Sequence, residues 1–191
     1  MVRRRSRLLL QIIHDVTSIG WLGVGFAQLT LNLIALATGV PALRHDAHEI
    51  THLFDRWLLT PLALLAVGSG VLLATRTTWG LLRYWWIVVK LMLAATLLVF
   101  MPVWMGAWAA QAAAQTAGPV ASGYLTTRVD LLAGSVTVVS TLLFVVVVSV
   151  VKPWGRTPRG RRLARAARFR AAPDERPGGA ALTLSHSVPT G

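Results

Sequence analysis

The segment HEITH, residues 48–52, carries the residue types of a zinc site. In the H-E-x-x-H pattern, two histidines one helical turn apart bind zinc, and the glutamate between them acts as a general base. A helix over the surrounding segment would bring three histidines and one aspartate onto a single face: His45, His48, His52 and Asp55. His45, His48 and His52 could therefore hold a metal ion, or respond to pH because histidine changes charge near neutrality.

A metalloprotease needs more than this motif supplies. The motif is followed by LFDRWLLTPLA, which lacks the H-x-x-G-x-x-H continuation that would carry a third ligand. The segment is also short, which leaves little material for a substrate cleft. We therefore expect an amphipathic helix at the membrane interface, with Ile50, Leu53 and Phe54 in the bilayer and the histidines facing water.

Charged residues inside apolar segments form a second candidate site. At the helical rise of about 1.5 Å per residue, His14, Asp15 and Lys90 lie at similar depths from the same end of their segments. Gly68–Gly70 reaches that depth in another segment and leaves space where larger side chains would stand. We expect the three charged residues to meet at this gap, either as a cofactor or proton site or as a structural ion pair, with Lys90 alternatively reaching the headgroups.

A stripe of polar and small residues continues from this site along the first apolar segment. It consists of His14, Ser18, Trp21, Gly25, Gln28 and Asn32, which follow one another at alternating spacings of four and three residues. Because lipid offers no partner to the amides of Gln28 and Asn32, the stripe should face other helices.

The elements that position these residues are four apolar blocks. The chain has 191 residues, of which 54% are hydrophobic and 14% charged, with a mean hydropathy of +0.59. Blocks of about 20 residues can cross roughly 30 Å of hydrocarbon as helices. We predict an all-α membrane protein, a bundle of four transmembrane helices within residues 12–152, with spans at about 12–38, 57–75, 84–108 and 131–151. The chain has no cysteine, which excludes disulfides, iron–sulfur clusters and cysteine-based zinc sites.

The distribution of Lys and Arg predicts the orientation of these spans. Most of the 19 basic residues lie in the N-terminal segment 1–11, in the connection between the second and third spans, and in the C-terminal tail. The opposite side carries only Arg44, Arg56 and Arg128. By the positive-inside rule both termini are cytoplasmic, and the protein is expected in the plasma membrane.

The tail, residues 153–191, is rich in Arg, Pro, Gly and Ala and is predicted to be largely disordered. Its segment Arg159–Arg170 could lie on anionic lipid headgroups as a short basic helix, or could simply be solvated. The positive charge is better explained by topology than by nucleic-acid binding. A bundle this small could also form a homodimer.

Several segments resemble an uncharacterised bacterial family of four-span proteins that is common in actinobacteria. The resemblance covers about residues 8–157 and rests on RTTWGLLRYWWIVVKLMLA, HDVTSIGWLG and KPWGRT. More distantly, an early histidine and a lysine in a W-x-x-x-K-L context resemble the HemJ-type protoporphyrinogen oxidases and the CopD-type copper-resistance proteins. In the HemJ-type pattern this pair is functional and the protein contains haem, which would give these roles to His14 and Lys90.

Three functions are therefore expected from the sequence. The first is a membrane redox or haem-associated protein that uses His14 and Lys90. The second is a protein that handles or transports metal ions or protons through the polar stripe. The third is a non-catalytic membrane subunit in which the stripe serves helix packing. The sequence indicates neither a reaction nor a substrate.

Overall fold

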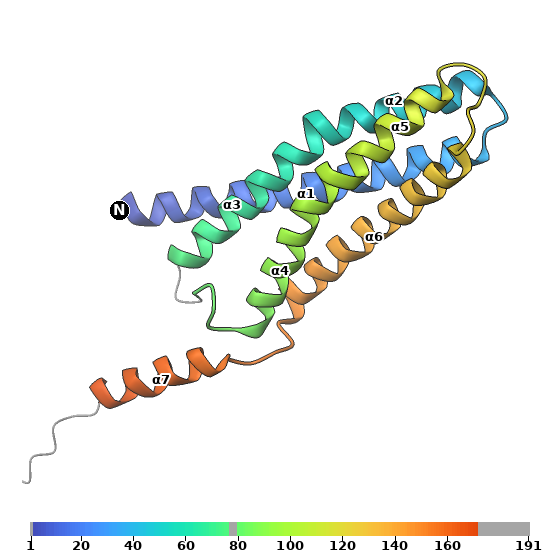
Figure 1. The fold of residues 1–191 in the computed structure, drawn as a ribbon. Coiled ribbons are helices and arrows are strands. Elements are labelled where there is room, and N and C mark those ends of the chain that lie inside the picture. Colours follow the sequence, from blue (N-terminus) through green and yellow to red (C-terminus); the bar gives the residue numbers. More distant parts are fainter. Residues whose placement is uncertain (1, 77–79, 172–191) are drawn as a thin grey trace, which may run out of the picture.

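The computed structural model describes residues 2–76 and 80–171, which fold into helices with no strand. The elements in chain order are α1 (Val2–Ala37), α2 (Pro41–Phe54), η1 (Asp55–Leu59), α3 (Thr60–Arg76), α4 (Trp85–Phe100), η2 (Met101–Met105), α5 (Gly106–Thr116), α6 (Tyr124–Val151) and α7 (Pro158–Ala171). η1 and η2 are single turns of π-helix. The elements α2, η1 and α3 run without a break, as do α4, η2 and α5 (Figure 1).

Four helices in the described ranges are long and apolar enough to cross a membrane, as predicted. They cover Arg5–Ala37, Pro41–Arg76, Trp85–Thr116 and Tyr124–Val151. The second has 36 residues, which corresponds to about 54 Å of helix and exceeds the roughly 30 Å of a hydrocarbon core. The helices are therefore longer than the spans expected from the apolar blocks alone.

Large apolar side chains cover the outside of the bundle. Ile19, Trp57 and Val150 are 72%, 69% and 76% exposed, and many further Leu, Val and Phe side chains are similarly uncovered. A water-soluble monomer rarely exposes apolar surface on this scale. Contact with lipid would remove this surface from water, which agrees with four membrane-crossing helices.

The predicted short interfacial helix between the first two spans is not a separate element. It is α2, the first part of the second long helix, and its histidine face is packed against protein rather than open to water. His48 is 1% exposed, whereas Ile50 and Leu53 are 39% and 50% exposed. The prediction was wrong on this point because the helix continues through η1, and α1 and α5 cover the polar face.

A proline accompanies each π turn, and for η1 it also explains the turn. Pro61 and Pro102 have no amide hydrogen, and a proline ring inside a helix clashes with the carbonyl group four residues earlier. Widening the turn by one residue relieves such a clash. In η1, directly before Pro61, the amide of Thr60 accordingly bonds the carbonyl of Asp55. In η2 the amide of Gly106 bonds the carbonyl of Met101, and Pro102 lies at the start of this turn. η1 and η2 pack against each other.

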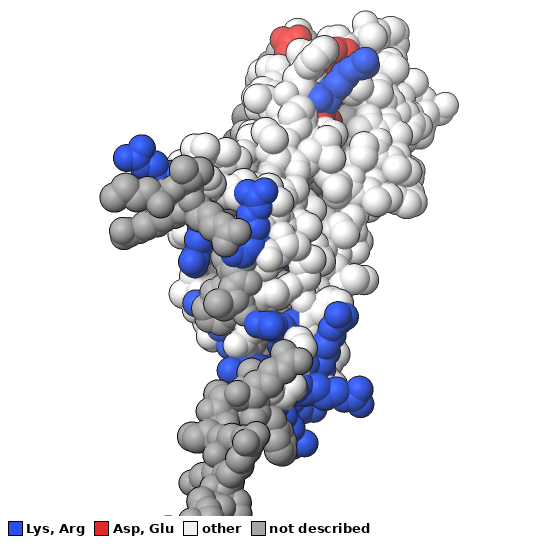
Figure 2. All heavy atoms as spheres, turned by 90° about the vertical axis from the view of Figure 1, so that its left-hand side faces the viewer, with Lys and Arg blue, Asp and Glu red and all other residues white. Residues whose placement is uncertain are grey.

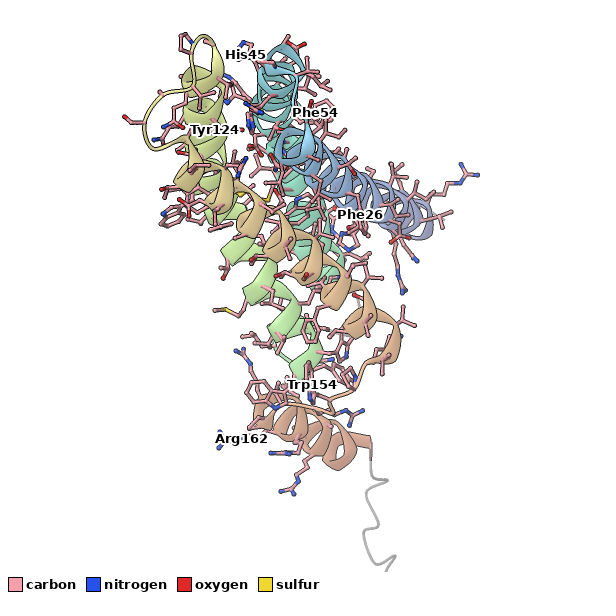
Figure 3. The ribbon with its side chains drawn as sticks, turned by 90° about the vertical axis from the view of Figure 1, so that its right-hand side faces the viewer. Phe26, His45, Phe54, Tyr124, Trp154 and Arg162 are labelled. Atoms are coloured by element: carbon pink, nitrogen blue, oxygen red, sulfur yellow. The ribbon has the colours of Figure 1, made fainter. Side chains whose placement is uncertain are left out.

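The bundle has two distinct ends (Figure 1). We call the end with the connections at residues 38–40 and 117–123 the hairpin end, and the end with the start of α1 and the end of α6 the terminal end. Towards the terminal end α1 pairs with α3 while α4 pairs with α6, and α1 diverges from α4 (Figures 1 and 3). The four helices are thus packed more closely towards the hairpin end.

An apolar core lies in the middle of the bundle between these two ends. It is formed by Trp21, Leu59, Ala63, Ala66, Leu97, Met101, Val138 and Leu142. A smaller apolar cluster joins α5 to α6 near the hairpin end, and it is formed by Met105, Ala109, Ala112, Tyr124 and Leu131. The buried residues of α1 repeat at helical spacing and include Trp21, Gln28 and Asn32, which confirms that the polar stripe faces the bundle.

The chain is helical at both of its described extremities. α1 begins at Val2, so the predicted basic segment 1–11 is continuous with the first span. In the tail, which was predicted to be largely disordered with a short basic helix as one alternative for Arg159–Arg170, residues Pro158–Ala171 form α7. The remainder of that prediction, for residues 172–191, lies outside the described residues.

Candidate functional site

His14 in α1 is held against α3 near the terminal end. Its Nδ1 lies 2.9 Å from the carbonyl oxygen of Ala66 and 3.3 Å from Oγ of Ser69. A Cβ atom at Gly70 would stand only 2.9 Å from Cε1 of His14. The absence of a side chain at Gly70 therefore makes room for the imidazole, as the sequence suggested for this glycine-rich segment.

Lys90 and Asp15 do not close around His14. Nζ of Lys90 donates a hydrogen bond of 3.0 Å to Oγ of Ser149 in α6, and Asp15 is exposed. The charge of Lys90 still interacts with both His14 and Asp15 at longer range. The three residues thus share a layer, as expected, but His14 bonds to α3 and Lys90 to α6 because these helix pairs diverge at this end. We call His14, Ser69, Lys90 and Ser149 the terminal-end site.

A denser group of buried polar side chains lies towards the hairpin end. Gln28 in α1 donates from Nε2 to Oδ1 of Asp55 at 2.9 Å and to the carbonyl oxygen of Thr51 at 3.3 Å. Asn32, one turn further along α1, donates from Nδ2 to Oγ of Ser135 in α6 at 2.7 Å. These bonds tie α1 to the second and fourth long helices and give a partner to the amide nitrogen of each side chain.

His48 extends this group to the start of α6. Its Nε2 lies 2.9 Å from the hydroxyl of Tyr124, and the two rings meet edge to face at 5.7 Å. One turn closer to the hairpin end, Nδ1 of His45 lies 3.3 Å from Oγ1 of Thr116 in α5. Figure 3 shows His45 and Tyr124 at this end of the bundle. We call Gln28, Asn32, His48, Asp55, Tyr124 and Ser135 the hairpin-end cluster.

Several buried atoms in and beside the hairpin-end cluster have no hydrogen-bond partner in the described part of the chain. They are Oδ2 of Asp55, Nδ1 of His48, Nδ1 of His52 and Oδ1 of Asn32. Asp55 is 5% exposed and His48 is 1% exposed. Buried polar atoms are nearly always hydrogen-bonded in proteins, so these four atoms call for an explanation. The carboxyl and imidazole groups can bind a proton, and all four atoms can bind a water molecule or a small polar ligand.

The predicted metal site does not form as a group of three histidines. His45 and His48 contact Thr116 and Tyr124, on two different elements. Among residues 2–76 and 80–171, no three His, Cys, Asp or Glu side chains come together in an arrangement that could hold a metal ion. The helical face carrying His45, His48, His52 and Asp55 is real, but its members make separate contacts with α1, α5 and α6.

The two polar regions are separated by the apolar core. His14 and Gln28 are about 21 Å apart along α1 at the helical rise of 1.5 Å per residue. Trp21 lies between them and packs with Leu59, Ala66 and Met101. The polar groups of the terminal-end site and those of the hairpin-end cluster therefore form two layers, with an apolar barrier between them.

Sequence reasoning found parts of the hairpin-end cluster but not its connections. The spacing placed Gln28 and Asn32 on a buried stripe and Asp55 on the histidine face, but it did not pair them. Nothing in the sequence pattern indicated Tyr124 as the partner of His48. One feature of the sequence could have predicted the contact. Two amides on one buried helical face need hydrogen-bond partners, and the next helix carries a carboxyl group on its polar face.

The fold and its polar layers define a class of protein rather than an individual one. Over residues 2–76 and 80–171 the chain is helical, with four helices able to cross a membrane and with polar side chains buried near both ends of the bundle. No protein-family model matches the chain, and it matches neither a curated protein nor a solved structure. The resemblance to the four-span bacterial family therefore stays a prediction from the sequence.

Proposed function

We propose that this chain is a multi-pass membrane protein that moves protons, with Asp55 as the group that binds and releases them. The observation that carries the proposal is the buried carboxyl of Asp55, in which Oδ1 accepts a bond from Gln28 and Oδ2 has no partner among the described residues. An ionisable group inside the membrane region of a bundle is costly, and such groups usually serve transport or proton transfer.

The chemistry of the surrounding side chains supports proton transfer. The carboxyl group of Asp55, the imidazole groups of His48 and His52 and the phenol of Tyr124 can each take up or release a proton. His48 and His52 each keep one ring nitrogen without a partner in the described structure. His48, His52 and Asp55 lie along one helical face from the hairpin end towards the apolar core, with Asp55 innermost, and Tyr124 contacts His48 from α6.

The apolar core supplies a closed gate in this proposal. A dry apolar constriction blocks the passage of ions until it widens enough to admit water. η1 and η2 meet at the edge of this core, and Leu59 and Met101, which belong to these turns, are part of it. π turns are weak points of a helix because they can change register locally. Movement of the two turns would connect Asp55 with the terminal-end site.

The distribution of the basic residues supports one orientation of the protein in the membrane. With both termini in the cytoplasm of a plasma membrane, the hairpin-end cluster would face the outside and His14 and Lys90 would face the inside. The support is the concentration of Lys and Arg at the terminal end, where Lys152 and the arginines of α7 lie (Figure 2). Protons would then enter through the histidine face of α2.

Asp55→Asn should abolish proton flux without unfolding the protein. The side-chain oxygen of asparagine can still accept the bond from Gln28, but the amide group cannot take up and release a proton as a carboxyl group does. We expect proteoliposomes containing the wild-type protein, loaded with a pH-sensitive dye and driven by a potassium diffusion potential, to show flux above empty liposomes. Proton flux through the variant should be at least about tenfold lower than through the wild-type protein, as expected when an essential proton carrier is removed.

Asp46→Asn is the matched control, because Asp46 lies in the same helix but is exposed. It should keep the wild-type flux. Equal flux for Asp55→Asn and the wild-type protein would refute the role of Asp55. Wild-type protein that is folded but no more permeable than empty liposomes would refute proton transport, and would favour the non-catalytic subunit.

A haem-associated function at His14 is a second candidate, and one contact favours it. Nδ1 of His14 bonds the carbonyl oxygen of Ala66, an arrangement that fixes the tautomer and leaves Nε2 with its lone pair. Histidines that ligate haem iron are commonly oriented in this way, and the iron would supply one-electron chemistry. Lys90 could then offer a positive charge to a haem propionate.

This second candidate predicts an absorption spectrum. Protein purified in detergent from haem-supplied cells should show a Soret band that shifts on reduction with dithionite, and His14→Ala should lose it. His45→Ala, which changes a histidine at the other end of the bundle, should keep the band. A featureless spectrum from folded wild-type protein would exclude haem at His14 and would leave the proposal for Asp55 untouched.

A further inference from the structure

α7 is attached to the bundle by specific backbone contacts. Tyr84 and Arg156 form an isolated β-bridge, and the amide of Trp85 bonds the carbonyl oxygen of Gly155 at 3.3 Å. Thr157 donates from its amide to the carbonyl oxygen of Arg83 at 2.9 Å and from its hydroxyl to that of Leu82 at 2.6 Å. The connection from α6 to α7 is therefore bound to the segment that precedes α4.

The first turn of α7 is fixed by its own sequence. Thr157 caps the helix, because its hydroxyl oxygen accepts a bond of 3.1 Å from the amide of Gly160, and Pro158 occupies the first helical position, which it favours. A Cβ atom at Gly160 would overlap the carbonyl oxygen of Arg83. Only glycine lets the helix approach the bundle so closely, so the contact sets where α7 begins.

The attached helix carries a cluster of arginines. Arg161, Arg162 and Arg165 line, together with Pro158, an open hollow of about 200 Å³. All three are exposed, and residues 152–171 include no Asp or Glu that could neutralise them. Figure 2 shows this concentration of basic side chains at the terminal end, whereas the acidic side chains visible in that view lie at the hairpin end.

The position of α7 next to the apolar helices indicates where these arginines are used. α7 begins seven residues after α6 ends, and exposed Trp85 and Trp154 lie at this junction. Tryptophan favours the boundary between hydrocarbon and headgroups. Leu163 is 43% exposed on another face of α7. A strongly basic helix at this level suits the headgroup surface of a membrane.

We infer that α7 is a membrane-surface helix whose Arg161, Arg162 and Arg165 bind the phosphate groups of anionic phospholipids. Guanidinium groups match phosphate in charge and in hydrogen-bond geometry. Lipid is the ligand that the attachment favours, because the contacts of Thr157 and Gly160 hold the arginines beside the four helices that cross the membrane. The inference is independent of proton transport, since no residue of α7 belongs to the hairpin-end cluster.

A single nitroxide label on α7 tests this inference in the full chain. The sequence contains no cysteine, so Ala166→Cys, an exposed position one turn after Arg162, provides the only attachment point. The labelled protein is placed in nanodiscs of phosphatidylcholine, with or without phosphatidylglycerol, and the access of oxygen and of a water-soluble nickel chelate to the label is measured. Phosphatidylglycerol should increase access of oxygen and decrease access of the chelate, because the helix is drawn onto the bilayer.

Replacing Arg161, Arg162 and Arg165 together by glutamine should remove this response. The matched control replaces Arg5, Arg7 and Arg76, three exposed arginines outside α7, and should keep it. Both variants lose the same charge, so an equal effect of the two would overturn the local site. A thermal melt of each variant in nanodiscs shows whether the bundle is still folded.

Inorganic phosphate distinguishes a lipid site from a site for a free anion. Millimolar phosphate added to phosphatidylcholine nanodiscs should leave the label in water. If phosphate alone changes the access of oxygen and of the chelate to the label, lipid binding is overturned in favour of a site for a soluble anion. A label that responds to neither lipid nor phosphate would show that the arginines are simply solvated.

Discussion

Gln28→Leu is expected to lower the free energy of unfolding by about 2 kcal/mol, the usual result when a buried polar group loses its partner. Leucine has a similar volume but no donor, so Oδ1 of Asp55 would lose its bond from Gln28, and the carbonyl oxygen of Thr51 would lose a second donor. Asp55 already has one oxygen without a partner in the described structure. The measurement is thermal or detergent-induced unfolding of the purified protein, followed by circular dichroism.

Two further variants separate the lost bond from a general effect of leucine. Gln111→Leu changes an exposed glutamine of α5 and should leave the unfolding transition where it is. The double variant Gln28→Leu with Asp55→Leu should be more stable than Gln28→Leu alone, because removing both partners of a buried pair is far less costly than removing one. If Gln28→Leu is as stable as Gln111→Leu, the result contradicts the Gln28–Asp55 bond.

Gly134→Leu should have a comparable effect for a different reason. A Cβ atom at Gly134 would overlap Sδ of Met105 and stand 3.3 Å from Cζ3 of Trp108, so leucine fits only if the buried side chain of Met105 gives way or α6 moves away from η2 and α5. Overpacking of this kind typically costs 1–3 kcal/mol, and we expect about 3 kcal/mol here because the added side chain has four carbons. The same unfolding measurement applies.

Gly23→Leu is the matched control for this substitution. Gly23 also lies in a long helix, but a Cβ atom there meets nothing within 4 Å. Because glycine is a poor helix former, this control should be neutral or slightly stabilising. Adding Met105→Ala to Gly134→Leu should recover part of the lost stability. If Gly134→Leu is as stable as Gly23→Leu, and adding Met105→Ala does not stabilise it, the close contact between α6 and η2 is disproved.

The two predictions bear on the proposed function in different ways. Gly134 and Met105 pack α5 against α6, so Gly134→Leu tests the frame that holds Tyr124 near His48. Gln28 contacts Asp55 itself, so Gln28→Leu tests the orientation of the proposed proton carrier. If Asp55 is the carrier, Gln28→Leu should also reduce flux in the folded fraction, whereas Gln111→Leu should not.

The four long helices could be predicted from the sequence because their cause is local. About 20 consecutive apolar residues are required to cross hydrocarbon, and each block supplies them without help from the rest of the chain. The burial of Gln28 and Asn32 could be predicted for the same reason, since a polar stripe at helical spacing has one direction in which it can find partners. The exact lengths were not predictable, because the helices continue past the apolar blocks.

The partners of those side chains could not be read from the sequence. Helical spacing states which residues share a face, but not which helix that face meets. The histidine face of α2 was therefore expected in water, and it is packed against α1, α5 and α6. Likewise His14 and Lys90 lie at similar depth as predicted, but their helices diverge and each bonds elsewhere.

The attachment of α7 shows the same division. Its basic composition is a property of the sequence, which also contains the threonine, proline and glycine that begin the helix. Whether that helix exists as part of the bundle depends on the carbonyl groups of Leu82 and Arg83, which are more than 70 residues away in the chain. The sequence by itself therefore determined helices, their apolar surfaces and the sign of the charge at each end. Only the tertiary structure decided which polar groups meet, because those meetings depend on the crossing of helices that are distant in the chain.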